Sequence, residues 1–294
     1  MANVRIVTDS TADIPQELRE RYNIEMVPLK VHFGNEMYQD AVTINPDQFY
    51  EKLANASKLP TTSQPSPVEF LEVYKRLEAQ SPDCAIISIH LSAAMSGTYQ
   101  SALLASSMLE EEQVDVTVID SKSASFGIGV YVLEAAKLAQ AGYDKDAILA
   151  RIAQLQQEQK LYFLVDTLEY LQKGGRIAKA SAMLGTLLNI KPILSIDKDG
   201  EVYAVEKVRG QKRLLQRVLE MYKEHFGDQP VDVGVGYSTE KSTADTVVAE
   251  LKSQFDVRSV QYTRIGAVIG THVGHGTVAV FVRPAAPDPE PLNS

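Results

Sequence analysis

The sequence is poor in several residue types that would support other kinds of protein. It contains a single cysteine, Cys84, so neither an internal disulfide nor a zinc site built from several cysteines can form. No stretch approaches the roughly 18–20 continuous apolar residues of a membrane-spanning helix, so we expect no stable membrane insertion. The first residues carry no pattern of a secretory signal, which predicts a cytoplasmic protein.

Positive charge is also scarce. The 29 lysines and arginines are outnumbered by 38 acidic residues, which gives a formal net charge of −9. Because nucleic-acid binding normally needs a basic face, this balance argues against a nucleic-acid partner. Hydrophobic residues make up 45% of the 294 residues, enough for an ordinary globular core and, at this length, for two domains.

The first part of the chain alternates strand and helix signals. A short strand is expected at 4–7, with a helix after it at 15–22. The β-branched runs at 85–89 and 116–119 are typical of strands buried on both faces, and each is followed by a helical pattern. This alternation predicts a parallel α/β domain over residues 1–165, with helices on its sheet.

The second part follows a different pattern. Apolar runs at 193–196 and 202–207 flank a turn signal and predict a hairpin, which implies antiparallel pairing. We therefore expect an α/β domain with a mixed sheet over residues 166–284. Residues 285–294 are rich in proline and predict a flexible tail.

Hydroxyl side chains gather in four segments of the first domain. Three follow predicted strands, and the fourth is expected to open a helix: Thr8–Thr11, Ser96–Thr98, Asp120–Ser123 and Thr61–Gln64. Such loops meet at the carboxyl edge of a parallel sheet, where helix starts also offer backbone N–H groups to an anion. The same residue types are common helix caps, so a purely structural role stays open for each segment.

The charge of these segments favours a carboxylate over a phosphate. Lys122 is their only basic residue, and the chain has no P-loop motif. Neutral donors suit a singly charged group.

Other candidates are weaker. The run from His272 to Gly276 predicts a glycine-rich loop; it lacks a suitably spaced carboxylate, so we expect no metal, although His272 alone could donate to a carboxylate. Ser96 lies outside any G-x-S-x-G elbow. Arg176 reads as a solvated charge after a helix stop and Arg209 as a surface charge, but either could contact a phosphate on a partner.

Six segments in sequence order resemble one family, the DegV family, whose members include fatty-acid-binding subunits of bacterial fatty acid kinase. They are Val7–Asp13, Thr62–Ser66, Ser96–Thr98, Leu171–Ile177, Lys191–Leu194 and Gly270–Gly274. The resemblance covers about residues 4–283. It departs at His275, where proline is expected, and at Gly210, where a small hydroxyl residue is expected after Arg209.

The resemblance implies a two-domain fold with a long-chain fatty acid bound between the domains. Thr62, Ser96 and the Gly97 N–H would hold the carboxylate, with His272 close to the same group. Ser63, Thr98 and Ser121 would lie near this site.

In the kinase system that the resemblance suggests, a separate ATP-dependent subunit phosphorylates the bound carboxylate for phospholipid synthesis. The chain itself would then be a carrier that needs no cofactor and has no catalytic residues.

Two alternative functions and the role of one apolar run remain open from the sequence. The chain could be an enzyme that uses Ser96 and His272 on a small carboxylate or phosphate. It could instead be a regulatory or scaffolding protein in which a fatty acid is only structural. The apolar run Met183–Leu188 could line an acyl tunnel or belong to an ordinary core.

Overall fold

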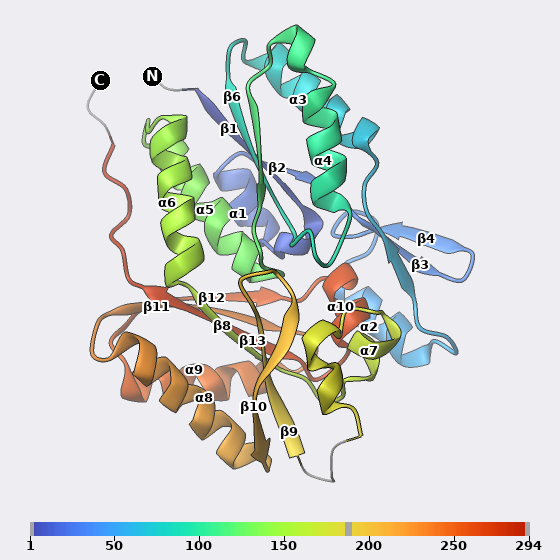
Figure 1. Cartoon of the computed structure of the whole chain (residues 1–294), viewed down its shortest axis with the longest axis vertical. Helices are drawn as coiled ribbons and strands as arrows, with labels where there is room; N and C mark the ends of the chain where they lie inside the picture. The colour runs from blue at the N-terminus through green and yellow to red at the C-terminus, as the bar shows by residue number, and fades with distance from the viewer. Residues whose placement is uncertain (1–2, 186–189, 292–294) are drawn as a thin grey trace.

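A computed structural model of the chain describes residues 3–185 and 190–291, which form two main sheets, one small sheet and their helices (Figure 1). Thr186–Leu188 of the apolar run discussed above lie outside the described residues.

The first main sheet is entirely parallel. Its strand order is β2-β1-β6-β7, and its strands are β1 (Val4–Asp9), β2 (Ile24–Val27), β6 (Ala85–His90) and β7 (Val116–Asp120). After β1 the chain forms β2 on one side of that strand, and it later returns to form β6 on the other side. The carboxyl ends of β1 and β6 therefore frame the crevice in which α/β sheets usually bind ligands.

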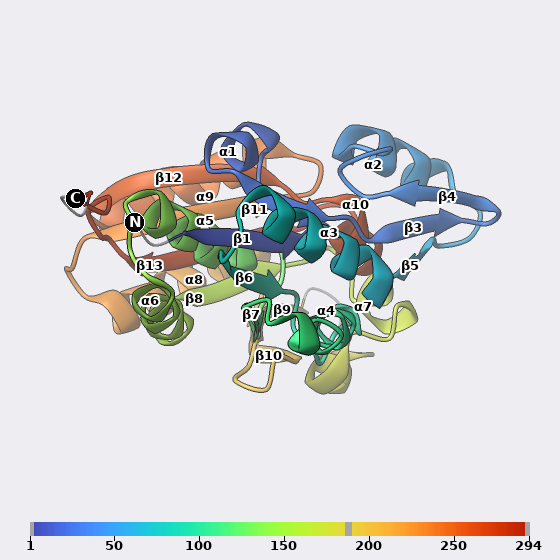
Figure 2. The same cartoon turned by 90° about the horizontal axis from the view of Figure 1, so that it is seen from above.

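Helices cover both faces of this sheet, as the alternation predicted. Helices α3 (Pro67–Gln80) and α4 (Thr98–Ser107) pack on one face. On the other face α5 (Phe126–Gln140) and α6 (Lys145–Glu158) lie side by side, with α6 along β7 (Figure 2). The short α1 (Gln16–Arg21) precedes β2.

The second main sheet is mixed. Its order is β10-β9-β8-β13-β11-β12, in which only β11 and β12 pair in parallel. Its strands are β8 (Lys160–Leu164), β9 (Ile190–Ile196), β10 (Val202–Arg209), β11 (Val231–Tyr237), β12 (Val257–Arg264) and β13 (Val278–Pro284). The predicted hairpin is β9–β10. Strand β8 belongs to this sheet although it precedes the expected boundary at residue 165.

The remaining helices of the second part are unequally distributed. The long helices α8 (Gln211–Phe226) and α9 (Lys241–Gln254) pack on the outer face of the mixed sheet. On its inner face, α5 packs between β1 and β11 and so joins the two sheets (Figure 2). Two short helices, α7 (Glu169–Lys173) and α10 (Ala267–Val273), pack against each other at the edge of this layer.

A small antiparallel sheet was not predicted. Its order is β4-β3-β5, with β3 (Lys30–Phe33), β4 (Glu36–Gln39) and β5 (Thr61–Ser63), and it lies near α2 (Pro46–Asn55). The expectation that Thr61–Gln64 opens a helix is wrong, because the β-branched Thr61 and Thr62 pair with β3. Helix α3 begins only at Pro67, after its cap Ser66.

The loop expected around His272 is also corrected. Residues Ala267–Val273 form α10, so His272 lies in the last helical turn. The helix stops at Gly274, whose φ of 74° is left-handed and whose missing Cβ leaves room for the ring of Tyr170.

The start of α3 provides a stability test. Ser66 and Glu69 form a capping box, and Lys30 of β3 pairs with Glu69 at 2.9 Å, so this cap ties the helix to the small sheet. Ser66→Ala should lower the free energy of unfolding by about 1 kcal/mol, because it leaves the Glu69 N–H without its acceptor. Urea denaturation measures this, and Ser66→Asn should retain most of the stability; equal losses in both variants would contradict the capping role.

Candidate functional site

A narrow cavity lies between the carboxyl edge of the parallel sheet and the inner face of the mixed sheet. The space between its atoms amounts to about 840 Å³, part of which is open to solvent, and its wall is mostly apolar. The mixed sheet contributes Leu161, Phe163, Ile196, Val202, Ala279 and Phe281. From the other side come Leu91, Met95 and Ala124, which follow β6 and β7.

Eight polar side chains line the same cavity, and six of them form a cluster whose segments contact one another. These six are Thr62, Ser63, Gln64, Ser96, Arg176 and His272, and the other two are Ser125 and Thr277. Thr62 Oγ1 lies 3.0 Å from His272 Nε2, although the two residues are 210 positions apart. Arg176 Nε donates to the carbonyl of Met95, next to Ser96, at 3.0 Å. The cavity therefore joins an apolar slot to a polar cluster.

His272 is held in its neutral form. Burial lowers its pKa to about 4, and the positive charge of Arg176 acts in the same direction. Its Nδ1 is buried without a hydrogen-bond partner among the described residues. A neutral imidazole has one donor and one acceptor nitrogen, so His272 can still offer a hydrogen bond to an anion.

Arg176, expected from the sequence to be a solvated charge or a contact to a phosphate on a partner, supplies a positive charge to the cavity wall. Its side chain is half-buried, and its guanidinium donates to the carbonyls of Met95 and Gly174 at 3.0 and 2.7 Å. Both acceptors are neutral, and no aspartate or glutamate of the described residues pairs with it. An anion in the cavity would compensate this charge.

The Ser96–Thr98 segment forms the start of α4. Ser96 Oγ lies 2.9 Å from Thr98 Oγ1 and accepts from the Thr98 N–H at 3.3 Å. Gly97 is the N-cap of α4 and lies so close to Gln64 that a Cβ there would meet Gln64 Nε2 at 2.8 Å. Neither Gly97 nor the buried Thr98 is part of the cavity wall.

Two further candidates lie outside the cavity wall. Ser121 is buried, and its hydroxyl bonds with the backbone of Ser123, so it stabilises the loop after β7. Arg209 is exposed at the end of β10.

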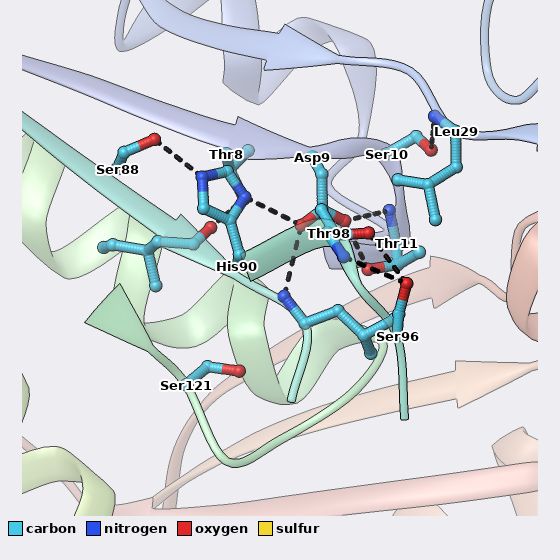
Figure 3. A network of polar contacts seen from close by, with 12 residues as sticks. Thr8, Asp9, Ser10, Thr11, Leu29, Ser88, His90, Ser96, Thr98 and Ser121 are labelled. Atoms are coloured by element: carbon cyan, nitrogen blue, oxygen red, sulfur yellow. Dashed lines mark hydrogen bonds and ion pairs between the residues drawn. The ribbon is translucent and has the colours of Figure 1, made fainter. Parts of the chain in front are cut away.

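The hydroxyl segment Thr8–Thr11 takes part in a buried hydrogen-bond network. Asp9 Oδ2 lies 2.9 Å from His90 Nδ1, and His90 Nε2 lies 2.6 Å from Ser88 Oγ (Figure 3). The Ser88 hydroxyl also accepts a hydrogen bond from Tyr74. The Asp9 carboxylate also accepts from the N–H groups of Thr11 and Leu91. These side chains are fully buried, so the network fixes the loop after β6 that leads to Ser96.

Two buried carboxylates anchor the other end of α10. Asp13 accepts from the Gly266 N–H at 2.9 Å and Asp40 from the Ala267 N–H at 3.0 Å. Burial raises the pKa of both groups, that of Asp40 to about 6. This role was not predicted, because nothing local in the sequence links these positions to residue 266. The pair fixes the helix that carries His272.

Within the described ranges 3–185 and 190–291, no group of three His, Cys, Asp or Glu side chains is placed to hold a metal ion. In the same ranges no helix combines the length and the apolar character that crossing a membrane requires.

The family model described as "Uncharacterised protein, DegV family" matches residues 3–285. The chain belongs to the DegV family. It is similar to Protein DegV of Bacillus subtilis, with 37% identity over 95% of this chain and 98% of that protein.

Two solved DegV-like structures extend the comparison. A DegV family protein from Thermus thermophilus, described by its fatty acid binding, has 37% identity and a TM-score of 0.89, covering 96% of this chain and 100% of that one. A stearic-acid-binding protein from Eubacterium ventriosum has 28% identity and a TM-score of 0.87, covering 97% and 98%. The predicted α/β fold, with one parallel and one mixed sheet, is thereby confirmed.

The pKa of His272 makes the stability of the ligand-free protein depend on pH. Because the folded pKa of about 4 lies below the ordinary 6.5, protons bind the unfolded chain first as the pH falls. The stabilising contribution is present above pH 6.5 and is lost toward pH 4. We expect wild type to lose roughly 3 kcal/mol more than His272→Gln between pH 7 and pH 4. Urea titrations measure this, and an NMR titration midpoint near 6.5 for His272 would contradict it.

Proposed function

We propose that this protein binds a long-chain fatty acid, with the acyl chain in the cavity and the carboxylate at the polar cluster. The observation that carries the proposal is the apolar slot that leads to Thr62, Ser96, His272 and the unpaired charge of Arg176. Relatives described as fatty-acid-binding proteins support it. The Gly97 N–H remains proposed as a further donor to the carboxylate, and Ser63, Thr98 and Ser121 remain proposed as nearby groups.

The two parts of such a ligand contribute differently. Each buried methylene contributes about 0.8 kcal/mol, so a sixteen-carbon chain offers roughly 11 kcal/mol before the entropy of binding is subtracted. Hydrogen bonds to a charged acceptor contribute about 1.5–3 kcal/mol each. The chain therefore sets the affinity, and the polar cluster sets the position of the carboxylate.

We further propose a carrier role, in which a separate ATP-dependent fatty acid kinase subunit phosphorylates the bound carboxylate for phospholipid synthesis. The arrangement of hydroxyls favours a carrier over an enzyme that uses Ser96 and His272. His272 Nε2 pairs with Thr62, and Ser96 pairs with Thr98, so the histidine is not placed as a base for Ser96. Exposed Arg209 remains a proposed partner contact, and the cytoplasm the proposed location.

Organic extraction of the purified protein followed by mass spectrometry tests the binding proposal. We expect a long-chain fatty acid that exchanges with added labelled palmitic acid and leaves unchanged. A chemically altered ligand would favour an enzyme, and a fatty acid that never exchanges would favour a structural role.

The charge of Arg176 should strengthen binding only of a ligand whose head group is charged. Arg176→Gln should weaken binding of palmitic acid by about tenfold or more, because a charge-assisted contact is lost, and should change binding of palmityl alcohol little. Competition with a fluorescent fatty acid measures both affinities. The control is Lys173→Gln, which removes an exposed positive charge nearby. Equal effects of Arg176→Gln on the acid and the alcohol would contradict a carboxylate at this position.

Ser96 should affect delivery of the carboxylate more than binding. Ser96→Ala removes one hydrogen-bonding group but leaves the acyl slot intact, so the Kd for palmitic acid should rise only a few-fold. Phosphorylation by a fatty acid kinase subunit should fall by about tenfold or more, because the carboxylate loses its fixed orientation. Parallel measurements of binding and phosphorylation decide this, and an unchanged phosphorylation rate would count against the assignment.

A further inference from the structure

A second cavity lies directly behind one wall of the acyl cavity. The space between its atoms amounts to about 970 Å³, part of which is open to solvent. Within the described part of the chain, Phe281 of β13 is the one residue that lines both cavities. Its other lining groups include Phe126 of α5 and the charged Glu134, Asp232 and Arg283. The Phe281 ring therefore separates an apolar slot from a polar space.

Strand β13 gives the direction of the acyl cavity. Side chains of a strand alternate between faces, so Ala279, Phe281 and Arg283 follow one another along one face at intervals of about 7 Å. The strand begins five residues after Val273 in the last turn of α10, which places Ala279 toward the polar cluster. A chain that extends from this cluster along β13 reaches Phe281 before Arg283.

The Phe281 ring is held by close packing. It forms an edge-to-face pair with Phe126 at 6.2 Å between centroids, and both rings are buried. A Cβ at Gly127 would meet the Phe281 ring at 3.0 Å, and Cβ atoms at Gly129 and Gly234 would meet the Phe126 ring at 2.6 and 2.7 Å. Glycine within a helix costs about 1 kcal/mol relative to alanine, so α5 gives up helix stability where these rings pack.

The space beyond the ring is unfavourable for a hydrocarbon. Arg283 pairs with Asp232 at 3.3 Å and with Glu134 at 3.5 Å, and all three side chains are largely buried. An acyl chain that passed Phe281 would have to displace a packed ring and then lie against these charged groups, which lose hydration in its presence.

We propose that Phe281, supported by Phe126, closes the tail end of the acyl cavity and sets the longest acyl chain that the protein accepts. This inference rests on the proposed fatty-acid binding and adds its chain-length limit.

A competition among fatty acids of different length tests the limit. Delipidated protein is mixed with equal amounts of myristic, palmitic, stearic, arachidic and behenic acid, and the bound species are counted by native mass spectrometry. In wild type, occupancy should rise with chain length and then fall beyond the limit. Phe281→Ala should move this limit to longer chains and raise the bound ratio of arachidic to palmitic acid by about tenfold or more, since each additional buried methylene contributes about fourfold in affinity.

Two further variants provide a control and an independent test. Phe163→Ala removes the same ring from a wall of the acyl cavity that the second cavity does not share, so it should leave the limit unchanged. Ala279→Leu adds bulk before Phe281 and should move the limit to shorter chains, which gives an independent result if Phe281→Ala folds poorly.

The outcomes separate the two proposals. If Phe281→Ala and Ala279→Leu both keep the wild-type chain-length profile, or if Phe163→Ala shifts it as far as Phe281→Ala, the chain-length inference is overturned. If wild type binds none of the five acids, the proposed function itself fails.

Discussion

The uneven cover of the mixed sheet is the constraint on which the site depends. Its outer face is packed by α8 and α9, whereas on the inner face α5 packs against β11 and α6 contacts β13. Apolar side chains of β8, β9, β10 and β13 therefore face the loops at the carboxyl edge of the parallel sheet, and they line the cavity. Two sheets whose facing surfaces are not fully filled by side chains create an apolar slot, which an apolar ligand can complete.

The polar cluster carries a positive charge that a bound anion would compensate. Burial and Arg176 together keep His272 neutral, so the cluster carries one positive charge from Arg176. A carboxylate placed there would pair with Arg176 and favour the protonated form of His272, because an opposite charge raises the pKa of an imidazole. Binding of an acidic ligand would thereby be coupled to proton uptake by His272, whose Nε2 lies 3.0 Å from Thr62 Oγ1.

Local signals in the sequence predicted most of the fold. The apolar runs at 85–89 and 116–119 form β6 and β7, and the runs at 193–196 and 202–207 form the β9–β10 hairpin. These features depend on residues a few positions apart, where strand propensity and turn chemistry decide the outcome. The strand β5 escaped prediction because three residues are stable as a strand only through pairing with β3, about thirty positions away in the sequence.

The candidate site was predictable only in part, for the same reason. Hydroxyl loops and His272 stand out as residue types, and the resemblance to a family added their expected roles. The half-buried position of Arg176 follows from contacts with Met95, 81 positions away, which no local pattern reveals. Sequence analysis likewise treated the Thr8–Thr11 segment as a candidate anion loop, whereas Asp9 is committed to His90 in the interior.

The Asp9–His90–Ser88 network also illustrates why residue types alone do not define an active site. Its carboxylate, imidazole and hydroxyl form a chain of contacts at hydrogen-bond distance, as in a hydrolase triad. All three side chains are nevertheless fully buried. The Ser88 hydroxyl is further engaged by Tyr74, so no reacting atom can approach it. The network orders the loop from Leu91 to Ser96. The groups available to a ligand are those that this loop places at the cavity.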